Sequence, residues 1–233
     1  MQRSTEAARA QSDGMAQSGR KDGSREEPEQ AMLEFATSTG ELERLSAQVA
    51  ANGFAHVRSA IAGPLLQSLE REARESEPAA VVTHSQSGVA YRARIAPLGP
   101  VSRQFLFSHS MTALLCAVFG ERFQPNEQQS CMTFYREGDH LGPHVDQPAA
   151  GCVVTAIAYV ATRRPARLSP NTGMVLCVFG EHAQPDGRPL LSIPTEAGTV
   201  VFGRGSTHLH ERPMLQRGEY VAAITACYVR APY

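Results

Sequence analysis

Net charge, long apolar runs and paired cysteine motifs are all scarce in this 233-residue sequence. Its 22 basic and 23 acidic residues nearly cancel, and the formal net charge of -1 gives no global positive field to attract nucleic acid. No run of about 20 apolar residues occurs, and the N-terminal segment lacks the apolar stretch of a secretion signal. We therefore expect a cytoplasmic protein that binds neither nucleic acid nor membranes.

The cysteines show no CxxC spacing, and most of them lie in apolar stretches that are predicted to be helix or strand. There are five, namely Cys116, Cys131, Cys152, Cys177 and Cys227. Cysteine pairs that bind metal or carry redox chemistry usually lie close together in the chain. A free cysteine behaves as a small apolar side chain, so we expect all five to be reduced residues of the core.

The chain length suits one catalytic domain with a substantial core. Residues 1–30 are rich in Ser, Gln, Glu, Arg and Gly, which predicts a disordered arm because few apolar side chains offset the entropy of ordering. In residues 31–124, apolar stripes predict helices at 32–52, from Gly63 onward and at 110–119, with a short strand at 54–58. These elements are expected to support a sheet from outside.

Residues 125–233 have a different pattern, in which short β-branched or aromatic runs alternate with Gly and Pro turns. The pattern is typical of antiparallel strands that close into a barrel or sandwich. We expect strands at 130–135, 142–145, 152–160, 173–179, 190–193, 199–202, 208–210 and 220–229. Together with residues 31–124, this half is expected to form one domain that is mainly β with flanking helices.

The segment from Phe134 to Asp146 carries the candidate chemistry. Alternate side chains of a strand share a face, so His144 and Asp146 are expected to point the same way. An imidazole and a carboxylate side by side can fill two adjacent corners of an octahedral metal site. A histidine from a distant strand would complete the two-histidine, one-carboxylate set of non-haem iron(II) oxygenases, with three positions left open.

This segment resembles the prolyl-hydroxylase-like branch of the 2-oxoglutarate-dependent dioxygenases. Tyr135, Gly138, His144 and Asp146 match that family's tyrosine, glycine and His-x-Asp motif at comparable spacing. Later runs at 154–160, 172–176, 197–202, 209–213 and 218–225 follow the family's order, so the resemblance covers residues 125–230. It implies a double-stranded β-helix, a cupin-like jelly roll, that uses iron(II), 2-oxoglutarate and oxygen, with ascorbate as a supporting reductant.

Two histidines compete for the third position on the metal. His208 and His210 are two residues apart, so both would lie on one face of a strand and alternation does not choose between them. The resemblance favours His210, because the family places this histidine about eight residues before a glycine, here Gly218. His208 stays the alternative, and His140 and His109 are expected to be solvated loop residues.

The resemblance also implies the residues that bind 2-oxoglutarate. Tyr135 corresponds to a tyrosine that forms a hydrogen bond with it, but Tyr220 stands where the family has the arginine for the distal carboxylate. A neutral phenol cannot form the charge-assisted bidentate pair that an arginine forms. Arg217 is the first substitute in the same turn, and the further candidates are Arg163, Arg164 and Arg230.

The expected reaction is hydroxylation of an unactivated C–H bond in a small polar metabolite such as an amino acid, with release of succinate and CO2. In related halogenases a small residue replaces the carboxylate, so an intact Asp146 disfavours halogenation. We expect an irregular lid at residues 84–108 to contact the substrate, through His84, Tyr91, Arg92, Arg94 and Arg103. The alternatives are a peptidyl or prolyl hydroxylase, a nucleic-acid demethylase, and a metal-containing barrel that acts as a sensor without turnover.

Overall fold

The computed structural model describes residues 38–86, 88–181 and 187–232, so the predicted disordered arm at 1–30 lies outside the described residues. The helices of the described part are α2 (Thr39–Asn52), α3 (Gly63–Ser76), α4 (Pro100–Leu106) and α5 (His109–Phe119). The strands are β1 (Phe54–Val57), β2 (Val81–Gln86), β3 (Val89–Ala96), β4 (Phe123–Tyr135), β5 (His140–His144), β6 (Val154–Arg163), β7 (Val175–Glu181), β8 (Leu191–Pro194), β9 (Val200–Gly203), β10 (His208–Arg212) and β11 (Tyr220–Arg230). None of these helices combines the length and apolar character needed to span a membrane.

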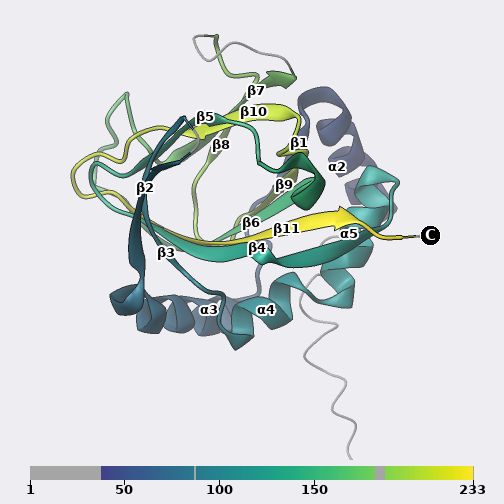
Figure 1. Ribbon diagram of the computed structural model, residues 1–233, viewed down its shortest axis with the longest axis horizontal. Helices are drawn as coiled ribbons and strands as arrows, with labels where there is room; N and C mark the ends of the chain where they lie inside the picture. Colours follow the sequence, from purple (N-terminus) through teal and green to yellow (C-terminus); the bar gives the residue numbers. More distant parts are fainter. Residues whose placement is uncertain (1–37, 87, 182–186, 233) are drawn as a thin grey trace, which may run out of the picture.

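In the described part of the chain, the strands form one 11-stranded sheet that curls into a barrel-like sandwich (Figure 1). One layer has the order β1-β9-β6-β11-β4 and the other β5-β10-β7-β8. Strand β3 joins the two layers, because Arg94 pairs with Phe134 of β4 while Tyr91 pairs with Leu141 of β5. The predicted double-stranded β-helix is confirmed.

The side chains of β6 and β11 alternate between two apolar clusters. Ala156, Ala158 and Ile224 pack against the helices, in the same cluster as Leu45 of α2 and Leu115 of α5. Their sequence neighbours face the other way, and Tyr159, Val221 and Ala223 belong to the cluster inside the barrel. Because successive residues of a strand point to opposite faces, β6 and β11 contact the helices with one face and line the interior of the barrel with the other.

The helices begin and end at residues suited to those positions. Ser108 accepts a hydrogen bond from the backbone N–H of Met111 and caps α5, which ends at Gly120 in the left-handed region, with φ 70°. Glu72 of α3 is buried and accepts hydrogen bonds from the backbone N–H groups of Val101 and Ser102 at the start of α4. This contact ties α4 to α3 beneath the sheet (Figure 1).

The expectation of an irregular lid at residues 84–108 is wrong. Strands β2 and β3 pair as a hairpin, and α4 follows them. Arg92 and Arg94 lie on β3 and reach the buried carboxylate of Asp139, at 3.2 and 3.8 Å. Tyr91, Ala93 and Ile95 alternate with the two arginines, and this period of two is the local signal of the strand.

The expectation that all cysteines are reduced is wrong for two of them. Cys152 and Cys227 form a disulfide, with their Cα atoms 4.8 Å apart, whereas Cys116, Cys131 and Cys177 are free. Cys227 lies on β11 and pairs with Thr155 of β6. Cys152 comes just before β6 in the chain. The pairing of two strands therefore brings together cysteines that are 75 residues apart in the sequence.

The Cys152→Ala/Cys227→Ala double variant is expected to lose about 2–4 kcal/mol of free energy of unfolding, because the crosslink restricts the unfolded chain. Urea unfolding of the oxidised protein and the double variant measures this difference. A dithiol reductant should lower the unfolding midpoint of the parent protein and leave that of the double variant unchanged. Equal midpoints for the oxidised parent and the double variant would contradict a stabilising disulfide.

Candidate metal centre

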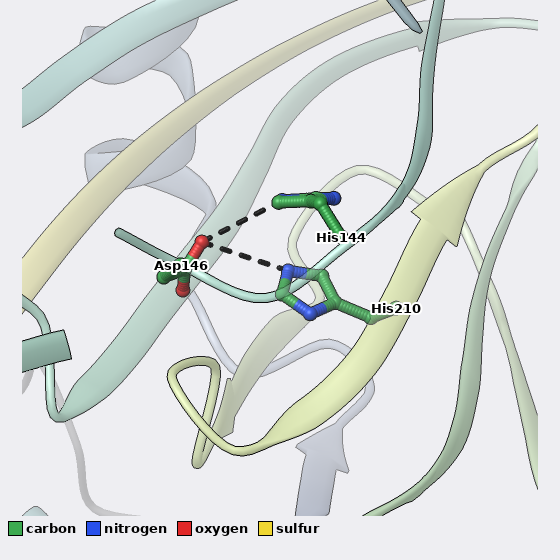
Figure 2. A group of neighbouring side chains, drawn as sticks. All are labelled: His144, Asp146 and His210. Atoms are coloured by element: carbon green, nitrogen blue, oxygen red, sulfur yellow. Dashed lines mark ion pairs between the residues drawn. The ribbon is translucent and has the colours of Figure 1, made fainter. Parts of the chain in front are cut away.

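His144, Asp146 and His210 meet inside the barrel (Figure 2). Each offers one ligand atom, and these atoms lie within 4.8 Å of one another. Oδ1 of Asp146 is 3.6 Å from Nε2 of His144 and 3.8 Å from Nε2 of His210. These separations are too long for hydrogen bonds and suit groups that surround one metal ion. Two imidazoles and one carboxylate form the donor set of a non-haem iron(II) centre.

Strand pairing positions the two imidazoles. His144 of β5 and His210 of β10 are direct partners in the antiparallel register, and their ring centroids are 4.2 Å apart. Directly opposite side chains of antiparallel strands lie close together on one face. The ring of Phe54 packs against His210 with a centroid distance of 5.2 Å, and His210 is only 3% exposed. The strand register therefore holds both rings on the wall of the cavity.

Backbone carbonyls determine which nitrogen of each imidazole is free. Nδ1 of His144 lies 2.9 Å from the carbonyl oxygen of Gly142, and Nδ1 of His210 lies 2.9 Å from that of His208. A carbonyl can only accept, so each Nδ1 carries a hydrogen, and the neutral form of each ring has its lone pair on Nε2. Burial, together with the nearby His144, lowers the pKa of His210 to about 4. His210 is then neutral at pH 7, which is the form that binds metals.

Asp146 lies just beyond the end of β5, although alternation predicted a strand that continues through Val145. Its backbone N–H donates to the carbonyl of Gly205 at 2.9 Å, and the Thr155 hydroxyl donates to its Oδ2. Burial raises the pKa of Asp146, but the imidazoles of His144 and His210 and the Thr155 hydroxyl outweigh it and lower the pKa to about 2. The carboxylate is therefore ionised and ready to bind a cation.

His208 does not join the cluster. The pairing of β10 with β7 shifts register between His208 and His210, so the two side chains do not share a face as simple alternation predicted. His208 packs over Gly53, where an added Cβ would overlap its ring, and its Nδ1 lies 3.0 Å from the Thr207 hydroxyl. The structure therefore brings His210, and not His208, to His144 and Asp146.

A cavity of about 160 Å³ lies beside the three residues. Its lining includes Arg212, which sequence reasoning missed. Arg212 follows His210 by two residues on β10, and this spacing is the signal that could have found it. The other lining residues are Tyr91, Cys131, Thr133, Tyr135, Leu141, Thr155, Ile157, Tyr159, Leu176, Ala223 and Thr225.

Arg212 is a buried cation, 4% exposed, whose contacts are neutral. Its guanidinium donates to the carbonyl of Gly173 at 3.0 Å, to the hydroxyl of Thr195 at 2.9 Å and to that of Tyr159 at 2.8 Å. Within the described part of the chain, no acidic side chain forms an ion pair with it. A buried charge without a counterion is costly, so this end of the cavity suits a carboxylate ligand.

The residues expected to bind 2-oxoglutarate divide between the cavity and the surface. Tyr135 lines the cavity and lies under Arg212, whose guanidinium carbon is 5.2 Å from the ring centroid. Burial raises the pKa of Tyr135, which accepts a hydrogen bond from Tyr91. Tyr220 lies outside the cavity lining and donates to Glu77 at 3.0 Å, and Arg217 is exposed.

The other candidates named from the sequence have partners elsewhere. Arg163 stacks over Tyr220, Arg164 pairs with Glu196 and Arg230 pairs with Glu121. His84 and His109 are exposed, and His140 lies beside the carbonyl of Gly138. Arg103 pairs with Glu127 at 2.6 Å, and both line a second pocket that shares Cys131 with the cavity.

The sheet has the fold of solved 2-oxoglutarate–iron(II) oxygenases, including prolyl hydroxylases. A prolyl-4-hydroxylase of Pseudomonas putida superposes with a TM-score of 0.59 at 19% identity, over 82% of this chain and 100% of that one. The epimerase SnoN from nogalamycin biosynthesis gives a TM-score of 0.65 at 19% identity, over 83% of this chain and 84% of its own. A Trichoplax adhaerens prolyl hydroxylase, solved with a peptide of hypoxia inducible factor, gives 0.60 at 16% identity, over 84% and 95%.

No family model and no curated protein matches the chain. At these identities, the likeness to solved structures establishes the fold.

His210→Ala is expected to weaken metal affinity by at least about 100-fold, because the loss of even an outer partner of a ligand costs 10–100-fold. Calorimetric titration of the metal-free protein with Co(II) measures the change. His208→Ala is the matched control and should bind Co(II) as the parent does. The reverse result would make His208 the third ligand.

Proposed function

We propose that this chain is an iron(II)- and 2-oxoglutarate-dependent dioxygenase that hydroxylates an unactivated C–H bond of a small polar metabolite such as an amino acid. The observation that carries the proposal is one cavity lined by two kinds of group. His144, Asp146 and His210 offer metal ligands, and Arg212 is a buried cation that forms no ion pair with an acidic side chain of the described residues. A keto acid with two carboxylates would use the metal for its keto acid group and the cation for its second carboxylate.

The donor set fits iron(II), since two imidazoles and a carboxylate converge there. Iron(II) held there would supply the oxygen-activating chemistry in which oxidation of the substrate is coupled to conversion of 2-oxoglutarate to succinate and CO2. Because Nδ1 of His144 and of His210 contacts a backbone carbonyl, each ring would hold the metal through Nε2. Leu141, Ile157 and Leu176 line the cavity with apolar groups, which limit the access of water.

Arg212 is the residue that we assign to the distal carboxylate of 2-oxoglutarate, in place of Arg217 or Tyr220. The hydroxyls of Tyr159 and Thr195 already contact its guanidinium and are placed to join the same network. Tyr135 keeps the hydrogen-bonding role that the sequence indicates. A charge-assisted pair in a buried pocket is both strong and directional, which suits selection of a keto acid with a second carboxylate.

Arg212→Gln is expected to raise the dissociation constant for 2-oxoglutarate by at least about 30-fold, the equivalent of about 2 kcal/mol for a lost buried charge pair. The visible charge-transfer band of the anaerobic iron(II) complex reports this binding. 2-Oxopentanoate, which has a methyl group in place of the distal carboxylate, should bind both proteins similarly. Arg217→Gln is the control and should retain the preference for 2-oxoglutarate. A retained preference in Arg212→Gln would remove Arg212 from the proposed pocket.

The second pocket supports a small polar substrate. Its volume of about 350 Å³ lies within the range of small-molecule sites, and it adjoins the metal cavity at Cys131. Arg103 and Glu127 offer opposite charges at this pocket, and Phe107 and Leu98 offer apolar surface. A zwitterion with an aliphatic side chain complements these groups.

Polypeptide oxidation is the second candidate, favoured by the fold shared with the two prolyl hydroxylases. Among the structural neighbours, HygX of Streptomyces hygroscopicus was solved with nickel, 2-oxoglutarate and hygromycin B, so the fold also accommodates small molecules. The second pocket of this chain favours the small substrate, because its volume of about 350 Å³ lies within the range of small-molecule sites.

Succinate release with iron(II), 2-oxoglutarate and a panel of free amino acids is expected to exceed the substrate-free background for at least one amino acid. Asp146→Ala is the matched control and should abolish the increase, because it removes a metal ligand. Turnover only with proline-containing peptides would favour the peptidyl hydroxylase. Metal binding without any affinity for 2-oxoglutarate would leave a sensor-like barrel and overturn the enzyme.

A further inference from the structure

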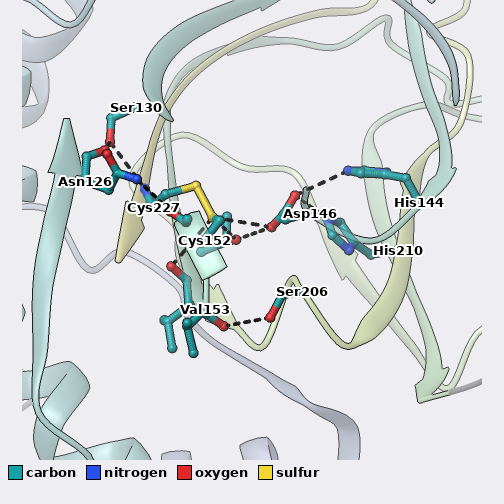
Figure 3. Close-up of a disulfide and its surroundings, with 12 residues drawn as sticks. Asn126, Ser130, His144, Asp146, Cys152, Val153, Ser206, His210 and Cys227 are labelled. Atoms are coloured by element: carbon teal, nitrogen blue, oxygen red, sulfur yellow. Dashed lines mark hydrogen bonds and ion pairs between the residues drawn. A yellow bond between two sulfur atoms is a disulfide. The ribbon is translucent and has the colours of Figure 1, made fainter. Parts of the chain in front are cut away.

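The two oxygens of Asp146 have different surroundings. Oδ1 faces the imidazoles of His144 and His210, at 3.6 and 3.8 Å. Oδ2 is turned away from them, accepts a hydrogen bond from the Thr155 hydroxyl and lies 3.8 Å from Sγ of Cys152. Figure 3 shows Asp146 between the disulfide and the two imidazoles. The carboxylate therefore has one oxygen for the metal and one oxygen engaged by the protein.

Thr155 is held in place by the elements around it. It is 3% exposed on β6 and lies opposite Cys227 of β11. Sγ of Cys152 is 3.3 Å from its hydroxyl, but a disulfide sulfur carries no hydrogen to donate. The single hydrogen of the Thr155 hydroxyl is donated to Oδ2 of Asp146. Its bond to the ionised Asp146 is charge-assisted and hence stronger than a neutral one.

Gly205 completes the support on the other side. Its carbonyl accepts the backbone N–H of Asp146, and a Cβ at this position would overlap Oδ2 of Asp146 and crowd the hydroxyl of Thr155 at 2.5 Å. The missing side chain of Gly205 thus leaves the space in which the carboxylate and the hydroxyl meet. Thr155 and Gly205, which are distant in sequence, thus both lie beside Oδ2 of Asp146.

We propose that Thr155 is a positioning residue that keeps Asp146 a monodentate ligand, an inference that rests on the proposed function. Carboxylates bind metals through one oxygen or through both. With Oδ2 engaged by Thr155, only Oδ1 would be free to bind a metal, which would leave three positions open. A bidentate keto acid and oxygen together need those three. The hydroxyl of Thr155 thus prevents the carboxylate from occupying a position that the cosubstrate requires.

Thr155→Val removes the hydroxyl at nearly constant shape, and Thr155→Ser restores it without the methyl group. Thr162→Val on the same strand is the matched control, since Thr162 pairs with Val221 and lies outside the cavity lining. Co(II) affinity of the oxidised, metal-free proteins is measured by titration. Thermal unfolding of the same samples reports whether each variant folds.

Thr155→Val is expected to bind Co(II) about 10- to 100-fold more weakly, as for other lost partners of metal ligands. Thr155→Ser and Thr162→Val should stay close to the parent. Anaerobic iron(II) at saturating concentration then tests the ligation mode, because a freed Oδ2 that binds the metal should also weaken 2-oxoglutarate in Thr155→Val. Parent-like affinities for both Co(II) and 2-oxoglutarate in folded Thr155→Val would overturn the inference.

Gly205→Ala gives a second route if Thr155→Val does not fold. It displaces Oδ2 without removing the hydroxyl, and the same two losses are expected. Parent-like binding in folded Gly205→Ala contradicts the proposal. Failure of the parent protein itself to bind Co(II) or 2-oxoglutarate would instead overturn the proposed function, so the two failures are distinguishable.

Discussion

The antiparallel pairing of β10 with β5 is the constraint on which the site depends. It places His210 directly opposite His144, so that two imidazoles 66 positions apart in the chain become neighbours on one wall. Each ring donates its Nδ1 hydrogen to the carbonyl two residues earlier in the chain, and this fixes the tautomer as well as the direction of Nε2. Neither ring needs a separate acidic partner to orient it, which leaves Asp146 available as a ligand.

Groups of opposite charge line the cavity. The anionic Asp146 lies with the imidazoles, and the cationic Arg212 lies against the rings of Tyr135 and Tyr159. Much of the remaining lining is apolar, so electrostatic interactions in the cavity are stronger than in water.

Under the proposed function, Arg212 would supply the cation for the distal carboxylate from another position in the chain. The position at which the resemblance expects an arginine is Tyr220, which pairs with Glu77 outside the cavity lining. Arg212 enters the cavity from the strand that also carries His210, and the faces of Tyr135 and Tyr159 lie against its guanidinium at 5.2 Å. Cation–π contacts of this kind compensate part of the cost of burying the charge. The fold, and not the position in the family motif, determines which cation lines the cavity.

Local pattern in the sequence was sufficient for the class of fold and for His144 and Asp146, and it left His208 and His210 as alternatives for the third residue. Short alternating runs and the His-x-Asp spacing depend on neighbours along one strand, where geometry repeats every two residues. Only the tertiary structure could decide what distant strands bring together. A register shift brings His210, and not His208, to the cluster, and the same strand places Arg212 in the cavity. The disulfide joins Cys152 to Cys227, which are 75 residues apart in the sequence. Such contacts depend on strand order and register, which no short window of sequence contains.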